Sequence, residues 1–149
     1  MNKLVRADIL KMGKEHIADV AEIEAEVFSA PWSAKAFMDT LTMEHVLFYV
    51  ALAEGEVAGY CGLYLAADEG EIAKVAAVPG RRRQGIGQRL LKQTMTEAHH
   101  RGAQRIFLEV RSQNAPAIGL YQKTGFHTVG RRKNYYQRPQ DDALVMMYE

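Results

Sequence analysis

Glu109 is a carboxylate in a position suited to general base chemistry. It lies in a predicted strand over residues 105–110, where alternate side chains are apolar and Glu109 shares the other face with Phe107. A carboxylate that loses hydration in a largely buried strand becomes a stronger proton acceptor. A structural ion pair, for example with Arg111, explains the same residue as well, so the sequence alone leaves both roles open.

Tyr121 carries a hydroxyl that could protonate a leaving group. It belongs to the apolar stripe of a predicted helix over residues 114–124, so the helix is expected to be docked and the ring partly buried. Packing alone also accounts for a tyrosine there. Asn114, two residues before Pro116, is the expected first cap of this helix, although its side-chain amide is equally able to contact a ligand.

A glycine-containing junction at residues 82–87, Arg-Arg-Gln-Gly-Ile-Gly, has the features of a phosphate-binding loop. It stands between a predicted strand and a predicted helix, where free backbone N–H groups and about half a positive charge from the helix dipole meet an anion. Leu90 at the third glycine position excludes a Rossmann fingerprint, and Gln88 and Arg89 exclude a Walker loop. A plain glycine-rich turn remains the alternative.

Neither a metal site nor a nucleophilic thiol is expected. The five histidines, at positions 16, 45, 99, 100 and 127, show no ligand spacing with one another or with Cys61. Cys61 lies in an apolar run over residues 57–65, which favours a buried, inert thiol. A lone cysteine cannot form an internal disulfide, which agrees with a reducing compartment.

Composition favours one cytoplasmic domain over residues 1–149. The chain is 48% hydrophobic and 25% charged, its apolar runs are too short to cross a membrane, and its start lacks a signal-peptide core. Nineteen basic and eighteen acidic side chains leave a net charge of +1, which argues against direct nucleic-acid binding. The basic clusters at 81–83 and 131–133 indicate either an anionic ligand, an acidic partner or a solvated face.

Periodicity predicts the element order β-α-α-β-β-β-α-β-α-β-β. Strands are expected over residues 5–11, 47–53, 57–65, 72–78, 105–110, 126–135 and 144–148, and helices over 17–29, 33–41, 86–101 and 114–124. Ser33 is the expected cap of the second helix. This order predicts an α/β (α+β) three-layer domain, with a mixed central sheet of about seven strands flanked by about four helices.

Taken in order, these motifs resemble the Gcn5-related N-acetyltransferase (GNAT) superfamily, and within it the bacterial ribosomal-protein-alanine N-acetyltransferases. The resemblance runs from about residue 20 to 146. It rests on the loop at 82–87, on Leu108-Glu109-Val110-Arg111 followed by Asn114, Ala117, Leu120-Tyr121 and Gly125-Phe126, on Phe28 with Pro31-Trp32-Ser33, and on Arg132, Tyr135-Tyr136, Pro139, Asp142-Ala143 and Met146. The sequence departs from the subgroup's pattern at Gln113, at Asp141, where Glu is frequent, and at Ala77-Val78-Pro79, which lacks the usual acidic residue before the proline.

The resemblance implies acetyl-CoA as co-substrate, with no metal, and a particular set of cofactor contacts. The pantetheine arm would lie beside Val75, Ala76 and Ala77, where a backbone N–H would stabilise the oxyanion. The pyrophosphate would bind to the amides of Arg83, Gln84, Gly85, Ile86, Gly87 and Gln88. Asn114 would also contact the cofactor.

The same resemblance implies direct transfer of the acetyl group. Glu109 would remove the amine proton through water, and Tyr121 would protonate the departing thiolate, whose pKa is about 8.5. Trp32 and Tyr135 are candidates to line a peptide groove, although ordinary aromatic packing explains them equally well.

The acceptor implied by the resemblance is a protein N-terminus, in particular the N-terminal alanine of a small-subunit ribosomal protein. An α-amine has a pKa near 7.7–8.0 and lysine near 10.4, so a neutral lysine at pH 7 costs roughly 3 to 4 kcal/mol more. A single carboxylate base therefore suits the α-amine. A lysine side chain or small amine is the first alternative acceptor, and a non-catalytic acetyl-CoA-binding module is the second. The sequence gives no oligomeric state.

Overall fold

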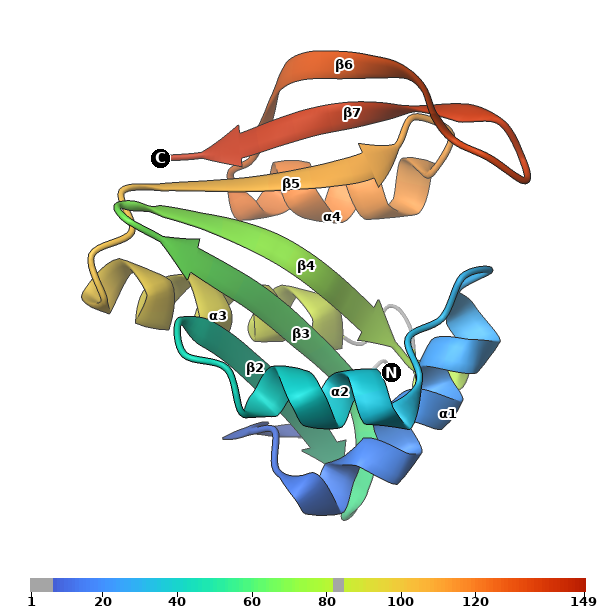
Figure 1. Ribbon diagram of the computed structural model, residues 1–149, viewed down its shortest axis with the longest axis vertical. Helices are drawn as coiled ribbons and strands as arrows, with labels where there is room; N and C mark the ends of the chain where they lie inside the picture. Colours follow the sequence, from blue (N-terminus) through green and yellow to red (C-terminus); the bar gives the residue numbers. More distant parts are fainter. Residues whose placement is uncertain (1–6, 82–84) are drawn as a thin grey trace, which may run out of the picture.

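The computed structural model describes residues 7–81 and 85–149, and within these ranges it contains seven strands and four α-helices (Figure 1). The strands are β1 (Ala7–Lys11), β2 (Val46–Ala53), β3 (Glu56–Ala66), β4 (Glu69–Ala77), β5 (Arg105–Arg111), β6 (His127–Tyr136) and β7 (Asp141–Tyr148). The helices are α1 (Ile17–Val27), α2 (Ala34–Leu41), α3 (Ile86–His100) and α4 (Ala115–Thr124), with short 3-10 turns at Lys14–His16 and Pro79–Arg81. The predicted element order is confirmed.

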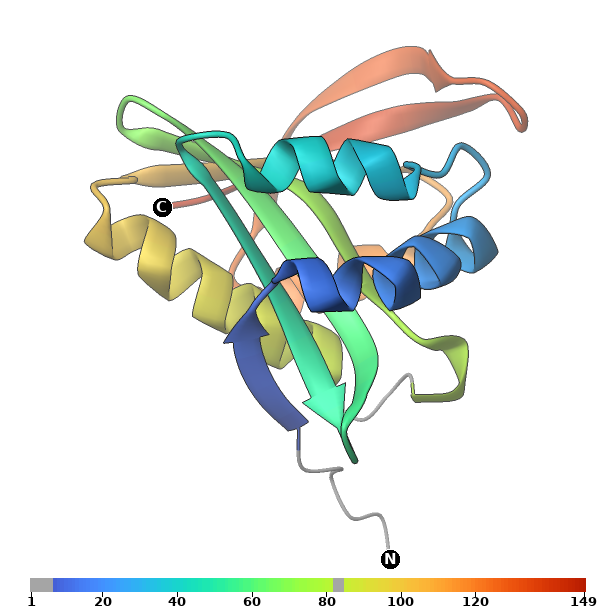
Figure 2. The same ribbon diagram turned by 60° about the horizontal axis from the view of Figure 1, so that its bottom comes forward.

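The strands form one mixed sheet in the order β1-β2-β3-β4-β5-β7-β6. Every neighbouring pair is antiparallel except β4 and β5, which run parallel. Helices α1 and α2 cover one face of the sheet, and α3 and α4 cover the other (Figures 1 and 2). The predicted three-layer fold is therefore confirmed. No helix in the described part of the chain is long and apolar enough to cross a membrane.

Local sequence signals account for the helices that border the site. Ser33 caps α2, because its Oγ accepts a hydrogen bond from the Ala36 N–H at 3.1 Å. The predicted stripe of α3 is its buried face, which consists of Ile86, Leu90, Leu91, Thr94, Met95 and Ala98. Burial of that stripe against β2, β3 and β4 fixes the direction of α3, and its N-terminal end lies just beyond the glycine loop.

Strands β4 and β5 separate soon after they begin. They pair only over Glu69–Glu71 and Arg105–Phe107, and beyond these residues each strand continues without the other. A bulge in β4 coincides with the separation, because Gly62 pairs with Lys74 and Leu63 with Ile72. Figure 1 shows the two strands diverging from their common end. The fold thus leaves the inner edges of two neighbouring strands apart in the middle of the sheet.

Candidate active site

The main chain of β4 turns toward the open side of this divergence at Val75 and Ala77. The Val78 N–H donates to the Ala58 carbonyl of β3 at 2.8 Å. The main-chain N–H and C=O groups of successive residues in a strand point to opposite sides. Ala76 therefore also turns its N–H and C=O toward β3, whereas Val75 and Ala77 turn theirs away. Of the three residues expected beside the pantetheine arm, Val75 and Ala77 can therefore meet an extended ligand with their main chain.

The start of α3 has the backbone that the glycine loop requires. Gly85 is the residue before the helix and adopts a left-handed conformation, with φ +78° and ψ 7°. Glycine adopts this conformation with the least strain, so the backbone favours a glycine here. Arg83 and Gln84, expected to contact the same pyrophosphate, lie outside the described residues. Ile86 is buried in the core, so any contact that it makes with a ligand must come from its main chain.

Gly87 is needed for helix packing, in addition to any contact with a phosphate. A Cβ at this position would lie 3.2 Å from the Leu120 Cδ2 atom of α4. Gly87 therefore allows α3 and α4 to pack closely, independently of any phosphate. This close packing also brings the helix that carries Tyr121 against the helix that begins at the loop.

Replacing Gly85 by valine is expected to weaken acetyl-CoA binding at least tenfold, because a β-branched residue in left-handed geometry costs about 1–2 kcal/mol and displaces the adjacent amides. Titration calorimetry measures the change. The matched control is Gly102→Val at the other end of α3, where φ is +102° and nothing lies within 4 Å of an added Cβ. It carries the same backbone strain, so it should lose stability and keep wild-type affinity. Equal affinity of both variants would contradict the role of Gly85.

Glu109 is the second residue after Phe107, the last β5 residue that pairs with β4. Its side chain is 21% exposed and its Oε1 lies 3.6 Å from Nε of Arg132. Its Oε2 is buried and, among the described residues, has no hydrogen-bond partner. A buried carboxylate oxygen without a donor is costly, and such atoms mark functional sites. Glu109 therefore offers a free acceptor beside the divergence of the strands.

The ion pair expected with Arg111 is not formed, and the register of the sheet explains the partner that takes its place. Glu109 pairs with Val145 of β7, which in turn pairs with Gly130 of β6. Arg132 lies two residues farther along β6, so its side chain emerges on the same face and reaches across Val145. The Arg111 guanidinium instead stacks on the Tyr136 ring at the end of β6.

Arg111 fixes the connection between β6 and β7. Its guanidinium lies 4.3 Å from the Tyr136 ring centroid and donates to the carbonyls of Pro139 at 2.8 Å and Gln137 at 3.4 Å. Burial raises the pKa of the half-buried Tyr136 hydroxyl, and the negative charge of Glu109 raises it further. Tyr136 is thus a neutral donor next to the proposed base.

Tyr136 is a site residue that sequence reasoning missed. Adjacent tyrosines occupy alternate faces of a strand, so one of the pair at 135 and 136 had to point toward the sheet. Tyr135, the candidate for a peptide groove, is 51% exposed and packs edge-on against Tyr136 with 5.1 Å between centroids, and its role in a groove stays a prediction. Tyr135 also lies under the Arg132 guanidinium, at 5.6 Å. The alternation signal was present, but only the register could say which ring was inside.

Tyr121 of α4 is buried in the core on the face of the sheet that α3 and α4 cover, with 7% of its surface exposed. Its ring packs edge-on against Phe126, with centroids 5.9 Å apart. Burial raises the pKa of its hydroxyl well above the usual range, and the neighbouring Cys61 thiol and Tyr136 hydroxyl raise it further. Tyr121 therefore keeps its proton at neutral pH and can act only as a donor. Cys61 is itself fully buried, as expected.

The junction between β5 and α4 is fixed by Asn114 and Asp141. Asn114 is confirmed as the helix cap, since its Oδ1 accepts a hydrogen bond from the Ala117 N–H at 3.2 Å. The Asp141 carboxylate accepts from the Ser112 hydroxyl and from the Gln113 N–H, which lowers the pKa of Asp141. Two of the three positions that depart from the family pattern, Gln113 and Asp141, thus contact each other. The cofactor contact of Asn114 stays a prediction.

Trp32 belongs to the loop between α1 and α2. Its ring packs against Phe37, with centroids 5.2 Å apart, and the Lys74 ammonium lies 4.5 Å from its centroid. Trp32 is partly exposed, so packing and groove lining are compatible with each other here. Lys74 precedes Val75, and this places Trp32 beside the open part of β4.

Internal ion pairs occupy much of the basic cluster at 131–133. The Arg131 guanidinium lies 2.6 Å from the Asp142 carboxylate, and Arg132 pairs with Glu109. Two of the three cations therefore serve the hairpin and the site rather than an external anion. In the other cluster, residues 82 and 83 lie outside the described part of the chain.

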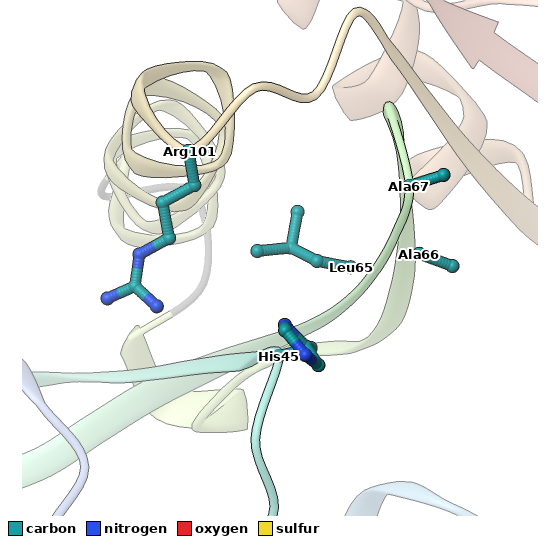
Figure 3. Close-up of a pocket in the computed structure, with 5 residues that line it drawn as sticks. All are labelled: His45, Leu65, Ala66, Ala67 and Arg101. Atoms are coloured by element: carbon teal, nitrogen blue, oxygen red, sulfur yellow. The ribbon is translucent and has the colours of Figure 1, made fainter.

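A pocket of about 320 Å³ lies away from these residues, between the end of β3 and the last turn of α3 (Figure 3). Its lining residues are His45, Leu65, Ala66, Ala67 and Arg101. It borders the end of the sheet where β5 begins, whereas Glu109 lies toward the other end of that strand. Among residues 7–81 and 85–149, no group of three or more His, Cys, Asp or Glu could hold a metal ion.

Known proteins that are similar to this chain agree with the fold and the motifs described above. The chain matches the acetyltransferase (GNAT) family over residues 17–126. A protein of Bacillus subtilis (strain 168) is 37% identical over 142 residues, which are 95% of this chain and 94% of that protein. The ribosomal protein bS18-alanine N-acetyltransferase of Escherichia coli (strain K12) is 33% identical over 83% of this chain and 84% of its own length. The crystal structure of the ribosomal-protein-S18-alanine N-acetyltransferase from Escherichia coli has a TM-score of 0.87 and 30% identity, and covers 96% of this chain and 93% of its own.

Proposed function

Because the chain belongs to the acetyltransferase (GNAT) family, we propose that it transfers the acetyl group of acetyl-CoA to the N-terminal α-amine of a protein. The acceptor that we propose is the N-terminal alanine of a small-subunit ribosomal protein. The support is a relative, 33% identical over 83% of this chain, that is named for alanine acetylation on ribosomal protein bS18. With such an acceptor, the cytoplasm is the expected compartment.

The divergence of β4 and β5 beside Glu109 is the observation that carries this proposal. The main chain of Val75 and Ala77 faces the open side, and the left-handed Gly85 precedes the N-terminus of α3. These groups suit an extended polar arm that carries a pyrophosphate at its α3 end and the reacting thioester at its other end, beside β4 and β5. The free Oε2 of Glu109 lies two residues beyond the last paired position of β5, so a proton acceptor is available where that arm would end.

The residues of the site divide the proton transfers between them. Acetyl-CoA supplies the reactive thioester, and the chain has to accept a proton from the amine and stabilise charge on oxygen and sulfur. Glu109 accepts the amine proton, through water, at its buried oxygen. A backbone N–H of β4 at Val75 or Ala77 stabilises the oxyanion, and the hydroxyl of Tyr121 donates toward the departing sulfur.

The acceptor proposal is tested by incubating the enzyme and acetyl-CoA with two peptides. The first begins with a free alanine and contains one internal lysine, and the second is the same peptide with a blocked N-terminus. We expect mass spectrometry to find one acetyl group on the first peptide, at the alanine, and none on the second. The Glu109→Gln enzyme serves as the control for uncatalysed acetylation.

The other outcomes assign the acceptor differently. Acetylation of the blocked peptide would move the assignment to lysine and contradict an α-amine acceptor. No product from either peptide, with acetyl-CoA binding retained, would favour a small amine or a binding function without transfer. Transfer to the free peptide regardless of its first residue would keep the α-amine and remove the alanine specificity.

A further inference from the structure

A buried cluster of hydrogen bonds and charges lies on the face of the sheet that α1 and α2 cover. Glu24 of α1 is fully buried, and both of its carboxylate oxygens are used. Its Oε1 accepts from the Tyr60 hydroxyl of β3 at 2.6 Å, and its Oε2 accepts from the Lys74 ammonium of β4 and from the Trp32 N–H at 2.9 Å. One side chain therefore joins a helix, two strands and the α1–α2 loop.

The Lys74 ammonium is held by aromatic rings as well as by the carboxylate. It lies 4.9 Å from the Phe28 ring centroid and 4.5 Å from the Trp32 centroid, and only 10% of its side chain is exposed. Contacts between a desolvated ammonium and ring faces are attractive and depend on orientation. Phe28 and Trp32 both belong to the loop over residues 28–33, so Lys74 binds this loop at two points.

The loop is fixed by these contacts at the strand that borders the proposed reaction site. Lys74 and Val75 are consecutive residues of β4, and their side chains lie on opposite faces. Val75 turns its main chain toward the diverging β5, while Lys74 holds the α1–α2 loop against the other face. A shift of the loop would therefore act on the part of β4 that borders the proposed reaction site.

We infer that Glu24, Lys74 and Tyr60 form a clamp that positions the α1–α2 loop for binding the acceptor. This inference rests on the proposed function, because it assigns the loop to the acceptor rather than to acetyl-CoA. The three are positioning residues, since they act through Phe28 and Trp32.

Physical chemistry distinguishes this role from stabilisation alone. Replacing a buried ion pair by apolar residues of similar size is often neutral for stability, so stability alone does not explain charges at this place. A carboxylate that accepts from three donors, however, fixes the relative positions of the groups that donate to it. The clamp therefore contributes a defined loop position, which an apolar contact would leave less defined.

The decisive variant is Glu24→Gln combined with Lys74→Met, which removes both charges together and so avoids leaving one buried charge without a partner. Thermal unfolding should stay close to that of the wild type, and calorimetry should give an unchanged Kd for acetyl-CoA. The KM for the alanine peptide should rise about 10- to 100-fold, with a smaller change in kcat. Lys74→Arg keeps the charge and the ring contacts, and it should recover most of the wild-type KM.

Trp32 is the only tryptophan of the chain, so its fluorescence reports directly on the loop. In the double variant the emission should shift to the red, because the ammonium no longer holds the ring. The ring should also become more accessible to quenching by acrylamide. Lys35→Met is the matched control, since Lys35 forms an exposed ion pair with Asp39 of α2 at 2.8 Å. It should leave both the emission and the KM unchanged.

Wild-type emission together with a wild-type KM in the double variant would overturn the clamp. A loss of acetyl-CoA affinity equal to the rise in KM would also overturn it, because the loop would then act on the cofactor. If the wild-type enzyme fails to acetylate the peptide, the proposed acceptor fails. The fluorescence and acetyl-CoA measurements still decide whether the clamp positions the loop.

Discussion

Replacing Glu109 by glutamine is expected to lower kcat about 10²- to 10⁴-fold, which is the usual contribution of a general base. Glutamine keeps the size of the side chain and removes the proton acceptor. Steady-state kinetics with the alanine peptide measure the loss. Acetyl-CoA affinity, measured by calorimetry, should stay unchanged, because the proposed cofactor contacts come from β4, the start of α3 and Asn114 rather than from Glu109.

The ion pair with Arg132 offers a rival explanation of Glu109, and a second variant separates the two. If Glu109 served only to hold the hairpin, Arg132→Gln would lower kcat as much as Glu109→Gln. If Glu109 is the base, its own variant should be far slower. Glu97→Gln is the neutral control, since Glu97 is a partly exposed carboxylate paired with Arg101 at 3.1 Å, in the last turns of α3.

Stability gives an independent test of the same residue. The Glu109 Oε2 atom is buried and has no partner among the described residues, so the native state bears an unfavourable desolvation there. Glu109→Gln should therefore unfold at the wild-type temperature or above it, while activity falls. A large loss of stability in this variant would identify Glu109 as a structural residue.

The fold was predictable because its local signals agree with its packing. The buried stripe of α3 is the one expected from its period, Ser33 and Asn114 cap the helices that they were expected to cap, and the turns after Ala53 and Ala66 give the antiparallel meander. Each of these signals acts over a few residues, where periodicity and turn chemistry are strong. Glu109 and Tyr121 were located by the same means, together with the family resemblance.

The contacts around the site were not predictable, because they depend on strand register. The strand β6 pairs with β7 with irregularities between Thr128 and Gly130 and again between Arg132 and Tyr136. Each irregularity changes which side chains meet across the sheet. The sequence therefore offered Arg111 as an example of an ion-pair partner for Glu109, whereas the register brings Arg132 to it. The sequence also could not show that Tyr136 is the more buried of the two adjacent tyrosines.

Long-range pairs were missed for a related reason. Glu24 and Lys74 are fifty positions apart, and each resembles an ordinary surface charge in a sequence that carries many. Burial becomes evident only when α1 lies across β3 and β4. The sequence treated Gly85 and Gly87 alike, as glycines of a phosphate-binding loop. In the structure Gly85 adopts a left-handed backbone conformation, whereas Gly87 allows α3 and α4 to pack closely.

Replacing Tyr121 by phenylalanine should also lower kcat, by about 10²-fold or more, with the fold intact. The ring that packs edge-on against Phe126 is retained, so thermal unfolding should change little. The matched control is Tyr148→Phe, because Tyr148 packs against the same Phe126 ring at the same 5.9 Å between centroids. This control deletes a hydroxyl on the other side of Phe126 and should keep wild-type turnover.

The dependence of the rate on pH tests the role of Tyr121 as donor. Burial raises its pKa, and a donor has to be protonated, so its contribution persists as pH rises past the ordinary tyrosine value of about 10. Between pH 7 and about 10, the ratio of wild-type to Tyr121→Phe kcat should therefore stay constant. A thiolate with a pKa of about 8.5 is a weaker base than this phenolate, so complete transfer is uphill by at least about 2 kcal/mol. Burial raises the Tyr121 pKa and so increases that cost, and the hydroxyl therefore acts mainly by donating a hydrogen bond to the sulfur. A ratio that falls to one below pH 10 would mean that Tyr121 ionises there, and the proton donor would have to be sought elsewhere, with the Tyr136 hydroxyl as the first residue to test.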